Sequence, residues 1–266
     1  MPLPVSGFAE IDLRLRGTKD DYVASGHLQG EQLEVQDQRI ARAQTDFLKS
    51  KDLVHLSNLR ADTEAGQVSG EGWIFLGQEP RVLFEVQGQG ANPDVLVSDF
   101  ATSADFSVKV IGDPNDPVAY GEGTLFGLGS WSQGLQMAAG KFIFAGDDLL
   151  VFDGTARKGG SILHMPLGAL NLKSQTFAGI LQTLGFDAAD VPGLQGVTGR
   201  FAGSAMVEAD LSGETPVIEA QARLDSGDFS TGGLSVSGAS GDILYDGSQV
   251  LLSGASGRFE GGFRDL

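Results

Sequence analysis

Three segments of this chain share one local pattern, in which apolar and polar residues alternate and the run ends at a glycine. They are residues 11–17, 106–112 and 207–213, and their last glycines lie 95 and then 101 residues apart. Because side chains on a β-strand point alternately to the two sides, each segment would place its aliphatic residues on one face of a sheet. A pattern that returns with this period predicts repeated β-units that share a sheet or a core.

Each of the three glycines is followed by a polar turn and a second apolar run. The turns read TKDDY, DPNDP and ETP, and the returning runs begin at Val23, Val118 and Val217. Glycine tolerates the backbone conformations of tight turns, and aspartate, asparagine and proline favour them. The sequence therefore predicts one β-hairpin used three times.

Further apolar runs recur in the same order at 54–56, 149–152 and 250–252, and two more hairpins are indicated. One would turn at residues 146–148, and the other at Asp246-Gly247, a dipeptide typical of two-residue hairpin loops. We divide the chain accordingly into three repeat units, residues 1–76, 77–190 and 191–266, the third of them truncated.

One stretch departs from the alternating pattern. Phe177, Ile180, Leu181 and Leu184 are spaced as i, i+3, i+4 and i+7, and Gly185 follows them. This spacing predicts a short amphipathic helix over residues 176–185, closed by the glycine. Such a helix would pack on the sheet; the alternative is a mobile plug or gate.

Composition limits the classes of partner. Lys and Arg number 18 against 35 Asp and Glu, a formal net charge of −17, which repels nucleic acid and anionic membrane surfaces. No cysteine is present, and the longest aliphatic and aromatic run, residues 149–152, is far shorter than a membrane-spanning helix requires. The start of the sequence does not read as a signal peptide, and we expect the chain to be an excerpt of a longer protein.

The residues needed for catalysis or metal binding do not occur in the usual patterns. The histidines, His27, His55 and His164, are not spaced as a metal-binding pair, and no nucleophile-elbow or phosphate-loop motif is found. Acidic pairs at 20–21 and 147–148 fall in expected turns, and the segment 112–117 lacks the closing glutamate of a calcium loop. Trp73 and Trp131 are interpreted as packing or groove-wall residues. We expect no enzymatic activity, no cofactor, no metal and no nucleic-acid partner.

Apolar residues that alternate with polar neighbours are the candidates to line a binding face. A sheet with one apolar face must cover it with a second sheet, with helices or with a ligand. The alternative is that these residues form an ordinary sealed core. They are Ile11, Leu13, Leu15, Phe84, Val86, Phe106, Val108, Val110, Phe142, Phe144, Val207 and Leu211.

The serial order of these patterns resembles a known family. The phrases are IDLRLRGTKDDYVASGHLQG, FSVKVIGDPNDPVAYGEGTLFG and GRFAGSAMVEADLSGETPVIEAQARLDSG, with FAGILQTLGFDAADVPGLQGVTGRFAG leading into the third. They resemble the periplasmic repeats of the TamB family, the inner-membrane subunits of the translocation and assembly module, and more broadly the AsmA-like proteins with repeating β-groove units. The resemblance covers nearly the whole chain, although each motif is degenerate and Tyr22 stands where the family pattern has proline.

The resemblance implies an all-β fold: an elongated, curled, mainly antiparallel sheet with an apolar concave face. It also implies a periplasmic location, with the full-length protein anchored to the inner membrane. The expected role is to support phospholipid transport to the outer membrane and the assembly of outer-membrane proteins such as autotransporters. The partners would be phospholipid acyl chains and, through regions outside this chain, an outer-membrane assembly barrel.

Two other classes of β-protein are alternatives to this one. Tandem β-sandwich modules, as in surface adhesins, would also repeat about every hundred residues, but would enclose separate cores. A carbohydrate-acting β-solenoid would show a period of about 20 to 30 residues, and the sequence has none.

Overall fold

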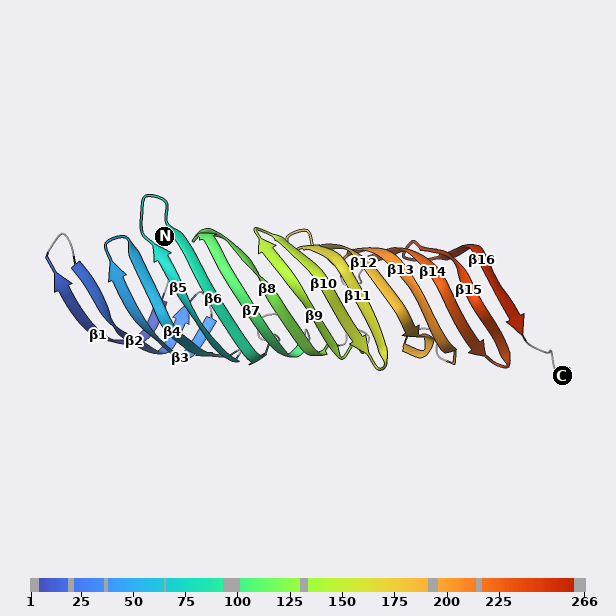
Figure 1. Cartoon of the computed structure of the whole chain (residues 1–266), viewed down its shortest axis with the longest axis horizontal. Coiled ribbons are helices and arrows are strands. Elements are labelled where there is room, and N and C mark those ends of the chain that lie inside the picture. The colour runs from blue at the N-terminus through green and yellow to red at the C-terminus, as the bar shows by residue number, and fades with distance from the viewer. Residues whose placement is uncertain are drawn as a thin grey trace. The chain divides into compact units, whose positions relative to one another are not determined.

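The computed structural model describes residues 5–18, 22–35, 38–64, 66–92, 101–129, 134–190, 196–213 and 217–260. These residues form sixteen β-strands in one sheet, and every strand lies beside its neighbours in the sequence (Figure 1). All of the strand pairs whose register is defined are antiparallel. The sheet is open, because β1 and β16 stand at the two ends of the strand order. The prediction of an all-β, antiparallel sheet is confirmed.

The strands are long, most of them between ten and fourteen residues. Their bounds are β1 Val5–Gly17, β2 Tyr22–Val35, β3 Gln38–Ser50, β4 Leu53–Thr63, β5 Gly66–Phe75, β6 Arg81–Ala91, β7 Ala101–Asp113, β8 Asp116–Leu128, β9 Met137–Ala145, β10 Asp148–Lys158, β11 Ser161–Asn171, β12 Thr176–Asp187, β13 Thr198–Asp210, β14 Val217–Thr231, β15 Leu234–Tyr245 and β16 Val250–Glu260. A 3-10 turn, η3 (Ala188–Asp190), follows β12.

The chain forms two compact units. The first comprises Met1–Trp131 and Ile143–Gly146, and therefore β1 to β8 with the end of β9. The second comprises Ser132–Phe142 and Asp147–Leu266, with the start of β9 and β10 to β16. The division into three units at residues 76 and 190 rests on recurrence along the sequence and stays a prediction.

The hairpins predicted from turn chemistry are present. β1 pairs with β2, β7 with β8 and β13 with β14, so the recurring hairpin returns every sixth strand. The recurring run at 54–56, 149–152 and 250–252 lies in β4, β10 and β16, which are also six strands apart. The turns at Gly146 and at Asp246-Gly247 separate β9 from β10 and β15 from β16. One repeat of about a hundred residues therefore corresponds to six strands.

The predicted helix over residues 176–185 is wrong, because these residues form β12. This strand is paired with β11 from Thr176 to Gln182 on one side and with β13 from Thr176 to Asp187 on the other. Gly179 lies within it, and a glycine inside a helix costs about 1 kcal/mol relative to alanine. Pairing on both sides supplies the backbone hydrogen bonds that a short helix would otherwise provide for itself. Among the described residues, no helix is long and apolar enough to span a membrane.

Within each unit, the described strands form one layer of sheet, and few of their side chains are completely buried. Among the described apolar residues, the buried ones are alanines, namely Ala24, Ala91, Ala101, Ala104 and Ala188. The chain exposes 17579 Å², whereas a compact protein of 27.8 kDa exposes about 11,000 Å². The larger side chains are thus covered only in part, by their neighbours in the same sheet.

Candidate functional site: the apolar sheet faces

The register of the first unit gathers apolar residues on one side of the sheet. Residues that lie directly opposite one another on paired strands point to the same face. A continuous row crosses β1 to β8 in this way and contains only apolar residues and glycine. We call the side that carries it the apolar face of the first unit. The row consists of Leu13, Gly26, Phe47, Leu56, Gly72, Phe84, Val110 and Ala119.

All of the lining residues predicted on β1, β6 and β7 belong to this face. Leu15 and Ile11 flank Leu13 on β1, and Val86 pairs with Val108, next to Phe84 and Val110. Phe106 lies opposite Gly88 on the same side. The residues of β6 and β7 are half-buried, whereas those of β1 are exposed, with Leu15 66% accessible.

Phenylalanine rings on this face lie over glycines of the neighbouring strand. A methyl group built on Gly72 would collide with the ring of Phe84, and one on Gly88 with the ring of Phe106. A ring that lies over a glycine covers the backbone of the neighbouring strand. The rings of Phe84 and Phe106 therefore occupy the space that a larger residue at Gly72 or Gly88 would take.

The second unit has an apolar face of the same kind. Val207 lies opposite Gly179 and Ala220, and it stands on β13 in an alternating series with Phe201. Phe186 and Phe229 flank Phe201 from the adjacent strands, with ring centroids 5.8 and 6.2 Å from its own. Three phenylalanines from β12, β13 and β14 thus form a ladder on this side, which we call the apolar face of the second unit.

The other predicted lining residues lie at less defined positions. Phe142 and Phe144 are half-buried on β9, and both alternate with the exposed residues Lys141 and Ile143. Leu211 lies just beyond the end of β13 and is 40% accessible. Alternation along each strand is consistent with the prediction for these positions.

The opposite face of the first unit is charged. Lys109 Nζ donates to Glu85 Oε1 at 2.6 Å across β6 and β7, and this hydrogen bond raises the pKa of Lys109. Asp46 accepts from Asn58 Nδ2 at 2.8 Å and from His27 Nδ1 at 2.9 Å. These hydrogen bonds, with that of Asn58 the larger cause, lower the pKa of Asp46. The two sides of the sheet therefore differ in polarity as the alternating sequence predicts.

An aromatic stack interrupts the charged side. The rings of His55 and Trp73 are stacked, with centroids 4.8 Å apart, in a cross-strand row with Leu48, Leu83 and Ile111. Trp73, which the sequence indicates as a packing or groove-wall residue, lies by its register on the face opposite the apolar one. Trp131 lies outside the described residues.

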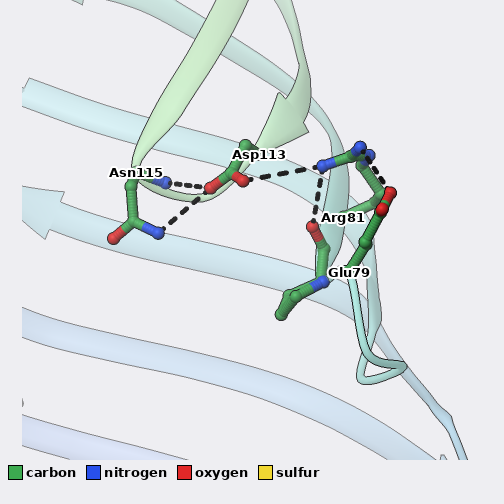
Figure 2. Close-up of polar contacts among 5 residues, drawn as sticks. Glu79, Arg81, Asp113 and Asn115 are labelled. Atoms are coloured by element: carbon green, nitrogen blue, oxygen red, sulfur yellow. Dashed lines mark hydrogen bonds and ion pairs between the residues drawn. The ribbon is translucent and has the colours of Figure 1, made fainter.

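The turn within residues 112–117, which lacks the closing glutamate of a calcium loop, is closed by its own hydrogen bonds. Asp113 Oδ1 accepts from the backbone N–H and the Nδ2 of Asn115, at 2.8 and 3.0 Å (Figure 2). Arg81 approaches the other carboxylate oxygen to 3.6 Å and also pairs with Glu79. The bonds from Asn115, with the nearby charge of Arg81, lower the pKa of Asp113. This carboxylate therefore stabilises the turn between β7 and β8, and its ion pair with Arg81 connects that turn to the start of β6.

The acidic pair at 147–148 also has a structural role, since Asp148 Oδ1 accepts from Asn171 Nδ2 at 2.7 Å. The pair Asp20-Asp21 lies outside the described residues. Within the part of the chain that the structure describes, no three His, Asp or Glu side chains are grouped so as to hold a metal ion. His164 is exposed on β11, and the buried Nε2 of His55 has no hydrogen-bond partner.

Sequence reasoning missed several residues of the apolar faces. Phe47, Leu56 and Phe229 belong to them but were not predicted, because β3, β4 and β14 show weaker alternation. Phe186 was missed because it follows a stretch of β12 that was predicted to be a helix. The glycines opposite the phenylalanines were also missed, since cross-strand partners are known only once the register is known.

Comparisons with protein-family models, with curated proteins and with solved structures found no match for this chain.

Proposed function

We propose that this chain is a non-catalytic segment of a TamB-like, periplasm-spanning protein, and that its apolar faces hold phospholipid acyl chains in transit between the two membranes. In that setting it would also support the assembly of outer-membrane proteins. The observation that carries the proposal is the uncharged row from Leu13 to Ala119, which crosses β1 to β8, while the described strands of the first unit all belong to the sheet that carries this row.

The energetics of acyl chains favour such a face. Each methylene withdrawn from water is worth about 0.8 kcal/mol, so a chain of about sixteen carbons meets a barrier on the order of 10 kcal/mol on entering water. A strip of half-buried valine and phenylalanine side chains removes much of that barrier by contact alone. No bond is made or broken, so the proposal needs no catalytic group.

The alternative of tandem β-sandwich modules is less well supported. A sandwich packs two sheets face to face and seals its large aliphatic side chains between them. The described strands all belong to one sheet, and Val108 and Phe84 are only half-buried. An open face favours binding along the sheet over binding through loops at the ends of closed modules.

Native mass spectrometry of the chain purified from a bacterial envelope tests the proposal. We expect phospholipid to remain bound to the wild-type chain, and Val108→Asp to reduce the retained lipid severalfold because it places a charge on the apolar face. Phe144→Asp should act in the same direction. The matched control is Ser107→Asp, which adds the same charge one residue away on the opposite, exposed side of β7.

The comparison between the two neighbouring substitutions decides the outcome. Lipid lost from Val108→Asp but kept by Ser107→Asp, with unchanged circular dichroism, supports binding on the apolar face. A wild-type chain that carries no lipid, or equal loss from both variants, contradicts the proposal.

A further inference from the structure

Among the residues that the structure describes, a single charged one lies on the apolar face of the first unit. The row beside the one described above also crosses β1 to β8, and Lys49 occupies its position on β3. Its direct neighbours are Ala24 on β2 and Val54 on β4. The other members of the row are uncharged: Leu15, Ile74, Val82, Gly112 and Pro117.

Lys49 has no acidic partner among the described residues. Its ammonium lies 4.9 Å from the centre of the Tyr22 ring, and Nζ is 3.5 Å from the Tyr22 hydroxyl. Arg42, Arg81 and Lys109 of the same unit each approach a carboxylate, and all three lie on the opposite, charged side of the sheet. In a chain with a net charge of −17, an unpaired, half-buried lysine on an apolar surface is unusual.

The surroundings of Lys49 fit the two chemical parts of an amphiphile. The ammonium retains donors beyond the one directed at Tyr22, and the phenol hydroxyl can donate as well, so together they can bind the oxygens of one phosphate. The adjoining row from Gly26 to Phe84 is apolar and uncharged. A charged group beside a continuous apolar strip matches a lipid with an anionic head and a hydrocarbon tail.

We propose that Lys49 and Tyr22 bind the head-group phosphate of an anionic phospholipid whose acyl chain lies across β4, β5 and β6. This inference rests on the proposed function and specifies the class of lipid. Strands are spaced about 4.8 Å apart, and an acyl chain fills half of a hydrocarbon core of about 30 Å. A tail that starts beside Lys49 therefore spans about three strands and reaches the ring of Phe84.

The test compares two single-chain lipids with the same tail, both used below their micelle-forming concentrations. Lysophosphatidylglycerol carries a net negative charge, lysophosphatidylcholine carries none, and inorganic phosphate is a third probe without a tail. Binding to the whole chain is measured by calorimetry for the wild type, Lys49→Met, Lys49→Arg and Tyr22→Phe. The control is Lys51→Met, which removes the same charge from the exposed turn between β3 and β4.

We expect the wild type to prefer the anionic lipid, and Lys49→Met to weaken its binding at least about tenfold, as the loss of one charge-assisted hydrogen bond predicts. Binding of the zwitterionic lipid should change less than twofold. Lys49→Arg should restore most of the preference, Tyr22→Phe should reduce it, and Lys51→Met should leave it intact.

Four results would overturn the inference, and they differ in what they say of the proposed function. Equal affinity for both lipids, or equal effects of Lys49→Met and Lys51→Met, refutes the head-group site but leaves acyl-chain binding standing. Inorganic phosphate bound as tightly as the anionic lipid refutes an amphiphile as the occupant. If neither lipid binds the wild type, the inference and the proposed function both fail.

Discussion

At the scale of single residues, the apolar face of the first unit depends on pairs of phenylalanine and glycine from neighbouring strands. Gly72 has an ordinary strand conformation, so its importance comes from the space above it, which the ring of Phe84 fills. We expect Gly72→Ala to destabilise the chain by about 1 to 3 kcal/mol, the usual cost of overpacking. The urea-unfolding midpoint measures this, with Gly77→Ala as the control, because a methyl group there meets no atom within 4 Å.

The same pair can be tested for direct coupling. If the loss of stability comes from contact with the Phe84 ring, Gly72→Ala should lower the free energy of unfolding by at least about 0.5 kcal/mol less in a Phe84→Leu background than in the wild type. Additive effects, or equal losses from Gly72→Ala and Gly77→Ala, would contradict the ring-over-glycine arrangement.

Alternation alone predicted the side of the sheet on which Phe84, Val86 and Val108 lie, because every second residue of a strand points to the same side. Their glycine partners and the isolated position of Lys49 could not be predicted in this way. Both depend on which residue of the next strand lies opposite, and a sequence without its register does not contain that information.

At the scale of elements, the hairpins followed from local chemistry but β12 did not. Phe177 and Leu181 are four residues apart, as are Ile180 and Leu184, and an offset of four keeps two side chains on the same side of either a helix or a strand. Offsets of three, as between Phe177 and Ile180, separate the two structures. In β12 these two residues point to opposite faces, and Leu184 is 89% accessible.

Two leucines of β12 distinguish the strand from the predicted helix. Leu181 lies opposite Ala205 and is half-buried, so Leu181→Ser should lower the free energy of unfolding by about 1 to 2 kcal/mol. Leu184→Ser should change it by less than about 0.5 kcal/mol, because its side chain already lies in water. Urea unfolding of both variants provides the measurement. Similar losses at the two positions would indicate the shared stripe of a helix.

At the scale of the whole molecule, a single-layer sheet leaves more of its surface in water than a closed fold does. The folded chain already exposes 17579 Å². The additional surface that it exposes on unfolding is therefore only about four fifths of the additional surface that a compact protein of this mass exposes on unfolding. Part of what remains in water in the folded state is the apolar side of the sheet, where Phe84, Val86 and Val110 are only half-buried. This surplus distinguishes the open faces from a compact fold of the same mass without reference to any ligand.

The heat capacity of unfolding reports this difference, because it rises with newly exposed apolar area and falls with newly exposed polar area. Compact proteins show about 12 to 15 cal/mol/K per residue, so the lipid-free chain should give about a fifth less. Scanning calorimetry measures the change between the folded and unfolded baselines even when two units unfold separately. The control is a compact β-sandwich protein of similar length, and the scan is repeated at several concentrations to detect association between copies. A concentration-independent value in the compact range would mean that the apolar faces are covered within the chain itself, and acyl chains would then have no surface on which to bind.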